Sequence, residues 1–392
     1  MFSVVSTAAI CGMRAVMVRV EVDVSQGLPG FLMVGYLGSE VKEAGERVRV
    51  ALKNVGISLP PMRITVNLSP ADIRKSGTGY DLPVAVGILQ ALGHVEESLA
   101  ADVMVAGELS LDGKVKEVKG VLPMVKTARE QGIRRCIVPW ENENEGALIP
   151  DVEVIGVSSL EEVIGLLGGK GCGEGKCAKT DGGKENGKEN GKENGKTDGK
   201  SRENVLDFSE VNGQQTAKRA AEIAAAGFHN LLLIGPPGAG KTMIAKRMIG
   251  ILPKLTEEEC LEVSSVYSIS GLLNRGNAFL TERPFLSPHH AITVQALAGG
   301  GTYPKPGIVS LAHKGILFMD EMPEFGAHVL DVLRQPLEEK KIQIARTGGN
   351  YEYPAEFMLV GAMNIATLKL IQWGNRKIAE NKAFREFQKV GG

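Results

Sequence analysis

One stretch decides the fold of the second half of the chain: Leu231-Leu232-Leu233-Ile234-Gly235-Pro236-Pro237-Gly238-Ala239-Gly240-Lys241-Thr242. Its apolar start predicts a buried strand, and residues 243–252 have helical spacing. Between them lies the pattern G-x-x-x-x-G-K-T, whose glycines let backbone N–H groups surround phosphate oxygens. We expect Lys241 to reach the β- and γ-phosphates and the Thr242 hydroxyl to bind Mg²⁺. Glycine-rich turns without nucleotides exist, but the complete pattern favours a nucleoside triphosphate site.

Two further apolar runs end in polar residues that complete such a site. Residues 315–319 are followed by Asp320 and Glu321, about eighty residues after the first pattern. We expect Asp320 to hold Mg²⁺ and Glu321 to polarise the attacking water, although ordinary surface acids also follow strands. Residues 357–363 form a third apolar run, which ends at Asn364, a side chain able to bond the γ-phosphate or that water. Three such strands indicate an α/β fold with a parallel sheet and a ligand at its carboxyl edge.

Composition indicates a soluble protein of two or three domains. The chain has 392 residues and a formal net charge of −1, so any contact with nucleic acid must come from a local patch. No apolar run is long enough to span a membrane, and the N-terminus has no signal-like region. Five cysteines without a zinc pattern favour reduced thiols, and we expect a cytoplasmic protein: Cys11, Cys136, Cys172, Cys177 and Cys260.

A low-complexity segment divides the chain. Residues 168–204 consist mainly of Gly, Lys, Glu and Asn, and 183–194 repeat Gly-Lys-Glu-Asn. Large apolar residues are scarce there, so little offsets the entropy of ordering this segment. Its charges nearly balance, which favours a flexible linker over a basic arm for nucleic acid.

Residues 1–167 alternate between strand-like and helix-like patterns. We expect strands over 16–24, 63–68, 103–109 and 136–139 and helices over 41–55, 82–92 and 121–131. These elements predict an α+β domain with its own core.

The motifs of the chain together resemble those of a known protein family. The whole arrangement is similar to the YifB/ComM proteins, a magnesium-chelatase-like branch of the AAA+ ATPases. The resemblance is carried by 235–242, Arg283-Pro284-Phe285, Pro288-His289-His290, Gly299-Gly300-Gly301, Pro304-Lys305-Pro306-Gly307, Ser310-Leu311-Ala312-His313, 317–321, 330–338, 77–83 and 107–109. It implies a Lon-protease-like domain at 1–167, an ATPase core at 205–364, ATP and Mg²⁺ as cofactors, and a homo-hexamer acting on single-stranded or branched DNA.

A basic hairpin is the expected DNA contact. Residues 340–353 predict two strands around Gly348-Gly349-Asn350, which could also be a plain exposed ribbon. In related AAA+ motors a hairpin before the third phosphate-facing strand points into the channel of the ring. The resemblance therefore implies that Lys340, Lys341 and Arg346 touch DNA phosphates without regard to sequence.

A Lon-like fold raises the possibility of a peptidase, which the residues disfavour. Such peptidases need a serine activated by a lysine within hydrogen-bond reach. Matching the motifs puts Tyr80 at the serine position and Leu122 at the lysine position. Ser76 and Lys119 are close in sequence to those positions but do not fall on the motif. We expect this domain to mediate assembly or to bind a substrate.

The last segment, 365–392, departs from the family pattern. Relatives continue after the third strand with Pro-Cys-Pro-Cys-Gly, a trans-acting arginine and a helical lid, none of which is recognisable here. Arg376 and Arg385 lie in an expected amphipathic helix over 376–389, but nothing identifies either as the missing arginine. We therefore expect a chain that is C-terminally truncated or altered in frame, that binds ATP and whose hydrolysis is impaired.

Two classes of function remain open. The first is an ATP-driven motor that unwinds DNA or migrates its branches, and the second is a chelatase- or chaperone-like ATPase that remodels a protein partner. The basic hairpin and the Lon-like domain favour the DNA motor. The sequence leaves open the true substrate, assembly, the role of residues 1–167 and the source of the arginine.

Overall fold

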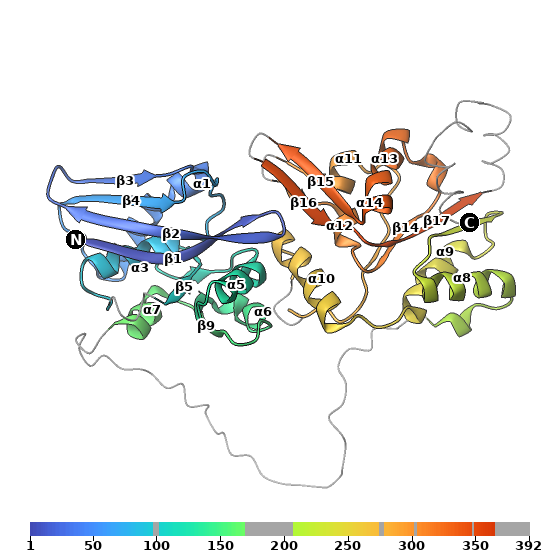
Figure 1. The fold of residues 1–392 in the computed structure, drawn as a ribbon, viewed down its shortest axis with the longest axis horizontal. Helices are drawn as coiled ribbons and strands as arrows, with labels where there is room; N and C mark the ends of the chain where they lie inside the picture. The colour runs from blue at the N-terminus through green and yellow to red at the C-terminus, as the bar shows by residue number, and fades with distance from the viewer. Residues whose placement is uncertain (97–101, 169–206, 274–277, 302–303, 347–348, 365–392) are drawn as a thin grey trace, which may run out of the picture.

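The computed structural model describes residues 1–96, 102–168, 207–273, 278–301, 304–346 and 349–364. Figure 1 shows two α/β units side by side along the long axis, each built around its own sheet. Among the described residues, no helix has both the length and the apolar character that a membrane crossing requires.

The first unit contains a seven-stranded sheet in the order β3-β4-β2-β1-β5-β8-β9. The pairs β1–β2 and β2–β4 are antiparallel, and the other neighbours in this sheet are parallel. The elements of this unit are β1 (Phe2–Cys11), β2 (Arg14–Ser25), β3 (Gly30–Val34), α1 (Ser39–Lys42), α2 (Ala44–Asn54), β4 (Arg63–Ser69), α3 (Asp81–Ala91), β5 (Val103–Val105), β6 (Glu108–Leu109), β7 (Val115–Lys116), α5 (Val121–Glu130), β8 (Arg135–Pro139), α6 (Glu143–Gly146), β9 (Glu153–Val157) and α7 (Leu160–Leu167).

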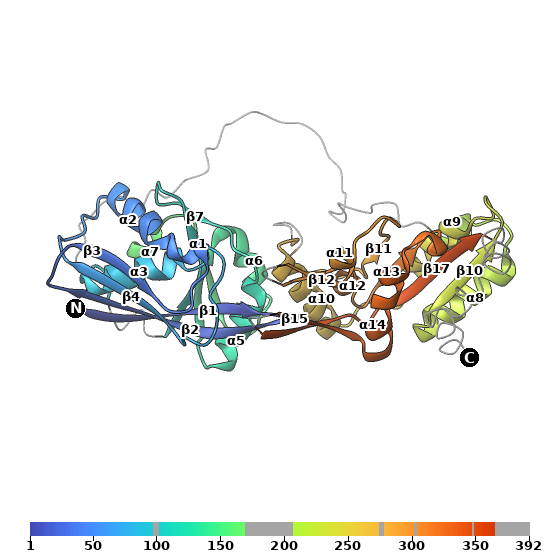
Figure 2. The same cartoon turned by 90° about the horizontal axis from the view of Figure 1, so that it is seen from above.

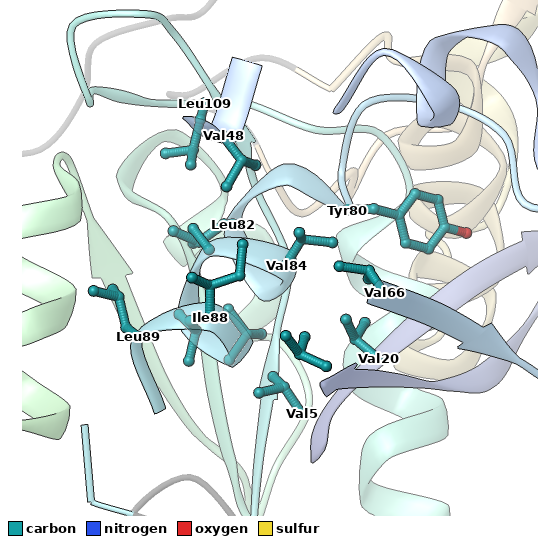
Figure 3. Packing of buried hydrophobic residues seen from close by; sticks show 14 of the residues in the cluster. Val5, Val20, Val48, Val66, Tyr80, Leu82, Val84, Ile88, Leu89 and Leu109 are labelled. Atoms are coloured by element: carbon teal, nitrogen blue, oxygen red, sulfur yellow. The ribbon is translucent and has the colours of Figure 1, made fainter. Parts of the chain in front are cut away.

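The middle of this sheet is covered on both faces. Along β5, Val103 and Val105 pack in the cluster around α3, whereas Met104 between them packs in the cluster around α5. Strand side chains alternate between faces, so both faces must be apolar here, and all three residues are buried. Figure 3 shows the α3 side, where Leu82 and Ile88 lie among side chains from the strands.

The second unit contains a four-stranded parallel sheet in the order β10-β17-β14-β11. The hairpin β15–β16 is a separate two-stranded sheet. The elements of this unit are α8 (Gln215–Gly227), β10 (Leu231–Gly235), α9 (Lys241–Arg247), α10 (Glu257–Ser270), β11 (Phe285–Leu286), α11 (Val294–Ala298), β12 (Gly299–Gly300), β13 (Lys305–Pro306), α12 (Ile308–Leu311), β14 (Ile316–Met319), α13 (Ala327–Val332), α14 (Arg334–Glu339), β15 (Lys341–Arg346), β16 (Gly349–Pro354) and β17 (Met358–Asn364).

Several details differ from the sequence prediction. The strand expected over 103–109 is broken, because Gly107 leaves the sheet to donate its N–H to the carbonyl of Gly79. The helix expected over 243–252 changes after Arg247 into a 3₁₀ turn over Met248–Ile251. Strand β1 was not anticipated.

Within the residues that the structure describes, the two units touch at α10 and at the β1–β2 turn. On α10, Leu261 packs against the apolar cluster around α5, and the Ser268 hydroxyl donates to the carboxylate of Glu145. Glu145 is 5% exposed, and burial raises the pKa of its carboxyl despite hydrogen bonds from Ser268, Asn142 and two backbone amides. At the second place, Met13 in the β1–β2 turn packs into the apolar cluster beneath β15 and β16, where Figure 2 shows the two hairpins meeting.

A buried ion pair joins three elements of the first unit. The Asp81 carboxylate at the start of α3 is fully buried and accepts two hydrogen bonds from Arg47 on α2, at 2.7 and 2.9 Å. It also accepts the N–H of Leu109 on β6 at 3.3 Å. Burial raises the pKa of Asp81, and the guanidinium of Arg47 opposes that rise.

We predict that Arg47→Leu destabilises the protein by about 3–5 kcal/mol, because it leaves a buried carboxylate without its partner. The control is Arg49→Leu on the same helix, which breaks an ion pair with Glu46 whose two side chains are 59% and 71% exposed. That change should cost less than about 1 kcal/mol. Urea denaturation followed by circular dichroism measures both, and equal losses would contradict a special role for the Arg47–Asp81 pair.

Candidate functional site

The carboxyl ends of three parallel strands converge on one edge of the second sheet. Strand β17 lies between β10 and β14, although it follows both in sequence. Its register places Asn364 opposite Gly235 at the start of the glycine-rich loop. Strand β14 pairs with the other side of β17, and Asp320 follows its last residue. The strand order therefore brings together the ends of three apolar runs that are far apart in sequence.

The glycine-rich loop has the backbone shape of an anion cradle. Gly238 and Gly240 have φ values of 78° and 83°, in the left-handed region that glycine adopts without strain. A Cβ added at Gly238 would meet nothing within 4 Å, so the loop is open on that side. Backbone turns of this kind direct successive N–H groups toward a bound anion.

The ammonium of Lys241 lies at the centre of this edge. It donates to the carbonyls of Gly235 and Pro236, both at 2.9 Å, and to Oδ1 of Asn364 at 3.0 Å. In the described part of the chain, all of these hydrogen-bond partners are uncharged oxygens. The positive charge is thus held in place without being neutralised, as an anion-binding group requires.

Thr242 and Asp320 form the second half of the site. The Thr242 hydroxyl donates to Oδ2 of Asp320 at 2.8 Å, and the other carboxylate oxygen accepts the N–H of Glu321 at 3.0 Å. A hydroxyl and a carboxylate in contact are oxygen donors of the kind that suit Mg²⁺. Glu321 is exposed and has a φ of 50°, which is uncommon for a residue with a side chain and occurs often at functional sites.

Sequence reasoning missed the segment that precedes α8. Gln214 donates from its amide to the carbonyl of Ala239 in the glycine-rich loop at 3.3 Å. Arg247 on α9 donates to the carbonyl of Asp207 at 3.0 Å and pairs with Glu210. These contacts fix 207–214 beside the loop, and no pattern in the sequence identifies them because each partner is 25 to 40 residues away.

Of the three residues expected to contact DNA, Lys341 and Arg346 lie on β15 of the hairpin and Lys340 lies directly before it. Lys340 Nζ bonds Glu356 at 2.6 Å, and Lys341 Nζ pairs with Glu352 on the facing strand at 3.0 Å. Arg346, at the end of β15, donates to the carbonyls of Gly301 and Ala345 at 3.4 and 2.9 Å. Two of the three expected cations are therefore already paired with carboxylates.

The positions matched to the peptidase motif lie in apolar surroundings. Tyr80 is 4% exposed and belongs to the cluster around α3, and burial raises its pKa. Leu122 is 1% exposed and belongs to the cluster around α5. Neither side chain provides a serine or a lysine, so the Ser–Lys chemistry has no counterpart at these two positions.

The fold and the site define a P-loop protein with a parallel sheet. The family model for magnesium chelatase, subunit ChlI, matches residues 207–389, and that for subunit ChlI of Mg-chelatase matches 20–142. The first match extends past Asn364, where the sequence departs from the expected motif.

Relatives identify the family more closely. The chain is 44% identical to the competence protein ComM of Haemophilus influenzae over 92% of this chain and 68% of that protein. It is 40% identical to YifB of Escherichia coli over 100% of this chain and 73% of YifB. A further similarity, 31% over 127 residues, is to Lon protease 2 of Bacillus subtilis and covers 32% of this chain and 22% of that protein. The chain belongs to the magnesium-chelatase-like YifB/ComM family of AAA+ ATPases.

We predict that Lys241→Ala weakens ATP binding by roughly a hundredfold or more, because the phosphates lose a charged donor. Lys246→Ala is the control, since Lys246 is an exposed lysine on the same helix. Titration with a fluorescent ATP analogue measures both affinities. Similar affinity in the two variants would show that the glycine-rich loop does not bind the nucleotide.

We predict that Glu321→Gln keeps ATP affinity within about threefold while lowering turnover by roughly a hundredfold or more, since an amide cannot accept a proton from water. Glu324→Gln in the next turn, also exposed, makes the same chemical change three residues away. Phosphate release and nucleotide titration separate turnover from binding. Unchanged turnover in the Glu321 variant would exclude it as the base.

Proposed function

We propose that this chain hydrolyses ATP and uses the energy to remodel DNA. The observation that supports hydrolysis best is the position of Lys241, which is held by three uncharged oxygens beside the Thr242–Asp320 pair. A triphosphate is the ligand that needs a fixed cation, a nest of N–H groups and a metal site together.

Each residue then has a definite role. Lys241 binds the β- and γ-phosphates, and Asn364, which already contacts its ammonium at 3.0 Å, orients the γ-phosphate or the attacking water. Thr242 and Asp320 hold Mg²⁺, which neutralises charge on the triphosphate when bound. Glu321 accepts a proton from the attacking water.

The proposal includes a ring of six identical subunits. A neighbouring subunit would supply the arginine that stabilises charge in the transition state. The candidates Arg376 and Arg385, the expected helix over 376–389 and the whole of 365–392 lie outside the described residues.

Two features support DNA as the substrate. One relative is a competence protein, ComM. In this chain the hairpin carries Arg346, whose described contacts are with carbonyls and not with a carboxylate, so its charge is available to a phosphate. Such contacts to the backbone of DNA bind without regard to sequence.

One observation favours the alternative, remodelling of a protein partner. A cleft of about 2030 Å³ lies between the two units and is lined by both cations and acids, including Arg14, Lys126, Glu117 and Glu258. Because the charges are mixed, this cleft has no strong preference for a polyanion. Turnover measured with single-stranded DNA, branched DNA and unfolded protein, for this chain and for one with the family-length C-terminus, tests the two functions directly.

We predict that charge reversal at Lys340, Lys341 and Arg346 weakens DNA binding by roughly tenfold or more and flattens its salt dependence, with nucleotide affinity unchanged. Arg346→Glu alone should account for most of this loss, because the two lysines are paired with Glu356 and Glu352.

Arg219→Glu is the control for Arg346→Glu. It reverses one exposed charge of the same unit, on α8, which is not part of the hairpin. Fluorescence anisotropy across a salt series measures affinity and slope. If the triple variant binds both single-stranded and branched DNA as tightly as the unmodified chain, the hairpin is a surface ribbon and the protein-remodelling alternative gains.

A further inference from the structure

The residue that joins the hairpin to the nucleotide-binding sheet is Glu356. Only Ala355, Glu356 and Phe357 separate the end of β16 from the start of β17. The Glu356 carboxylate accepts one hydrogen bond from Lys340 at the base of the hairpin and one from Lys314, each at 2.6 Å. This carboxylate therefore holds two cations from different parts of the unit.

The same residue is tied to the start of a second strand. Lys314 lies two residues before β14 and has a φ of 60°, and the N–H of Glu356 donates to Nδ1 of the neighbouring His313 at 3.1 Å. Strand β14 leads to Asp320, and β17 ends at Asn364. Glu356 is thus bound at the starts of the two strands whose other ends form the site for the triphosphate.

The contacts continue to α10. Glu259 on that helix is 3.7 Å from Lys314 and 3.1 Å from Arg283, and Glu262 is 3.1 Å from Nε2 of His313. Helix α10 is also the element that docks on the first unit. Glu356 is consequently linked to α10 through Lys314 and His313 as well as to the sheet.

Stability alone does not account for the Lys340–Glu356 pair. The Lys340 side chain is 67% exposed, and ion pairs with one exposed partner contribute little to folding. Burial would raise the pKa of Glu356, but the ammonium groups of Lys314 and Lys340 lower it to about 2, so the carboxylate is charged at neutral pH. The Lys340–Glu356 ion pair is therefore present at neutral pH, and it fixes the base of the hairpin relative to Glu356.

We propose that Glu356 is a positioning residue that couples the hairpin to the nucleotide site through Lys340, Lys314 and strands β14 and β17. A polymer that displaces the hairpin base then shifts the strands that carry Asp320 and Asn364, and a bound nucleotide changes the hairpin in return, since coupling is reciprocal. This inference rests on the proposed function for the identity of the polymer. The effect of the nucleotide on the hairpin can be measured without any polymer.

The adjacent lysine provides a matched control. Lys341 has the same charge and also pairs with a glutamate, but its partner Glu352 lies within the hairpin. Lys340→Met and Glu356→Gln cut the connection to the sheet, whereas Lys341→Met and Glu352→Gln remove an equivalent pair and leave that connection intact. Glu356→Asp retains the charge and should partly restore coupling.

The first experiment measures hydrogen exchange in residues 349–356 with and without Mg²⁺-ATP, in the Glu321→Gln background that retains ATP. We expect the nucleotide to slow exchange at least threefold in the Glu321→Gln protein. The same slowing is expected when Lys341→Met or Glu352→Gln is added to that protein. The change should be lost with Lys340→Met or Glu356→Gln. Absence of any nucleotide effect on the hairpin, or equal loss in both sets of variants, would overturn the inference.

The second experiment measures ATP turnover with and without branched DNA. In Lys340→Met and Glu356→Gln, we expect the factor by which DNA raises kcat to be at least fivefold smaller than in the unmodified chain. Nucleotide affinity should stay within twofold of that of the unmodified chain, and DNA affinity should equal that of Lys341→Met. If the exchange experiment succeeds while DNA stimulates none of the chains, the proposed DNA function fails and the coupling role of Glu356 stands. Equal stimulation of kcat in the Lys340 and Lys341 variants would overturn the coupling role.

Discussion

The parallel pairing of β10 with β17 is the constraint on which the candidate site depends. It places Asn364 beside Gly235, although the two are more than a hundred residues apart, and so allows Lys241 to bond both ends of the pair. Because β17 also pairs with β14, the same strand fixes where Asp320 lies relative to Thr242. A cation, a hydroxyl–carboxylate pair and a polar amide thereby share one sheet edge.

Three of the four strands of this sheet, β10, β14 and β17, could be predicted from sequence, because each is an apolar run. The two-residue strand β11 is too short to give such a pattern. The order of the strands could not be predicted, since it depends on hydrogen bonds between distant segments. Strand β1 shows the same limitation, because Ser3 and Thr7 weaken its apolar pattern. It forms a strand because all ten of its residues pair with β2. The position of Lys241 followed from the spacing of the motif, whereas its link to Asn364 did not.

The pairing of charged side chains on the hairpin was the feature least predictable from sequence. A run containing Lys340, Lys341 and Arg346 reads as basic, but folding brings Glu352 and Glu356 against the two lysines. Such cross-strand pairing depends on hairpin register, which a count of charges ignores. The ribbon is therefore less basic than its sequence suggests, and the charge that remains available is concentrated at its far end.

Helix α10 explains how the two units can influence one another. Its residues Glu259 and Glu262 pair with Lys314 and His313, which in turn bond Glu356, while Leu261 and Ser268 on the same helix contact the first unit. A rigid helix that meets both partners transmits the displacement of one to the other, because close-packed elements shift as bodies and deform little. The β1–β2 turn reinforces this, since Met13 packs beneath the hairpin itself. Residues of both units line the cleft between them, so any ligand that enters this cleft meets side chains from each unit.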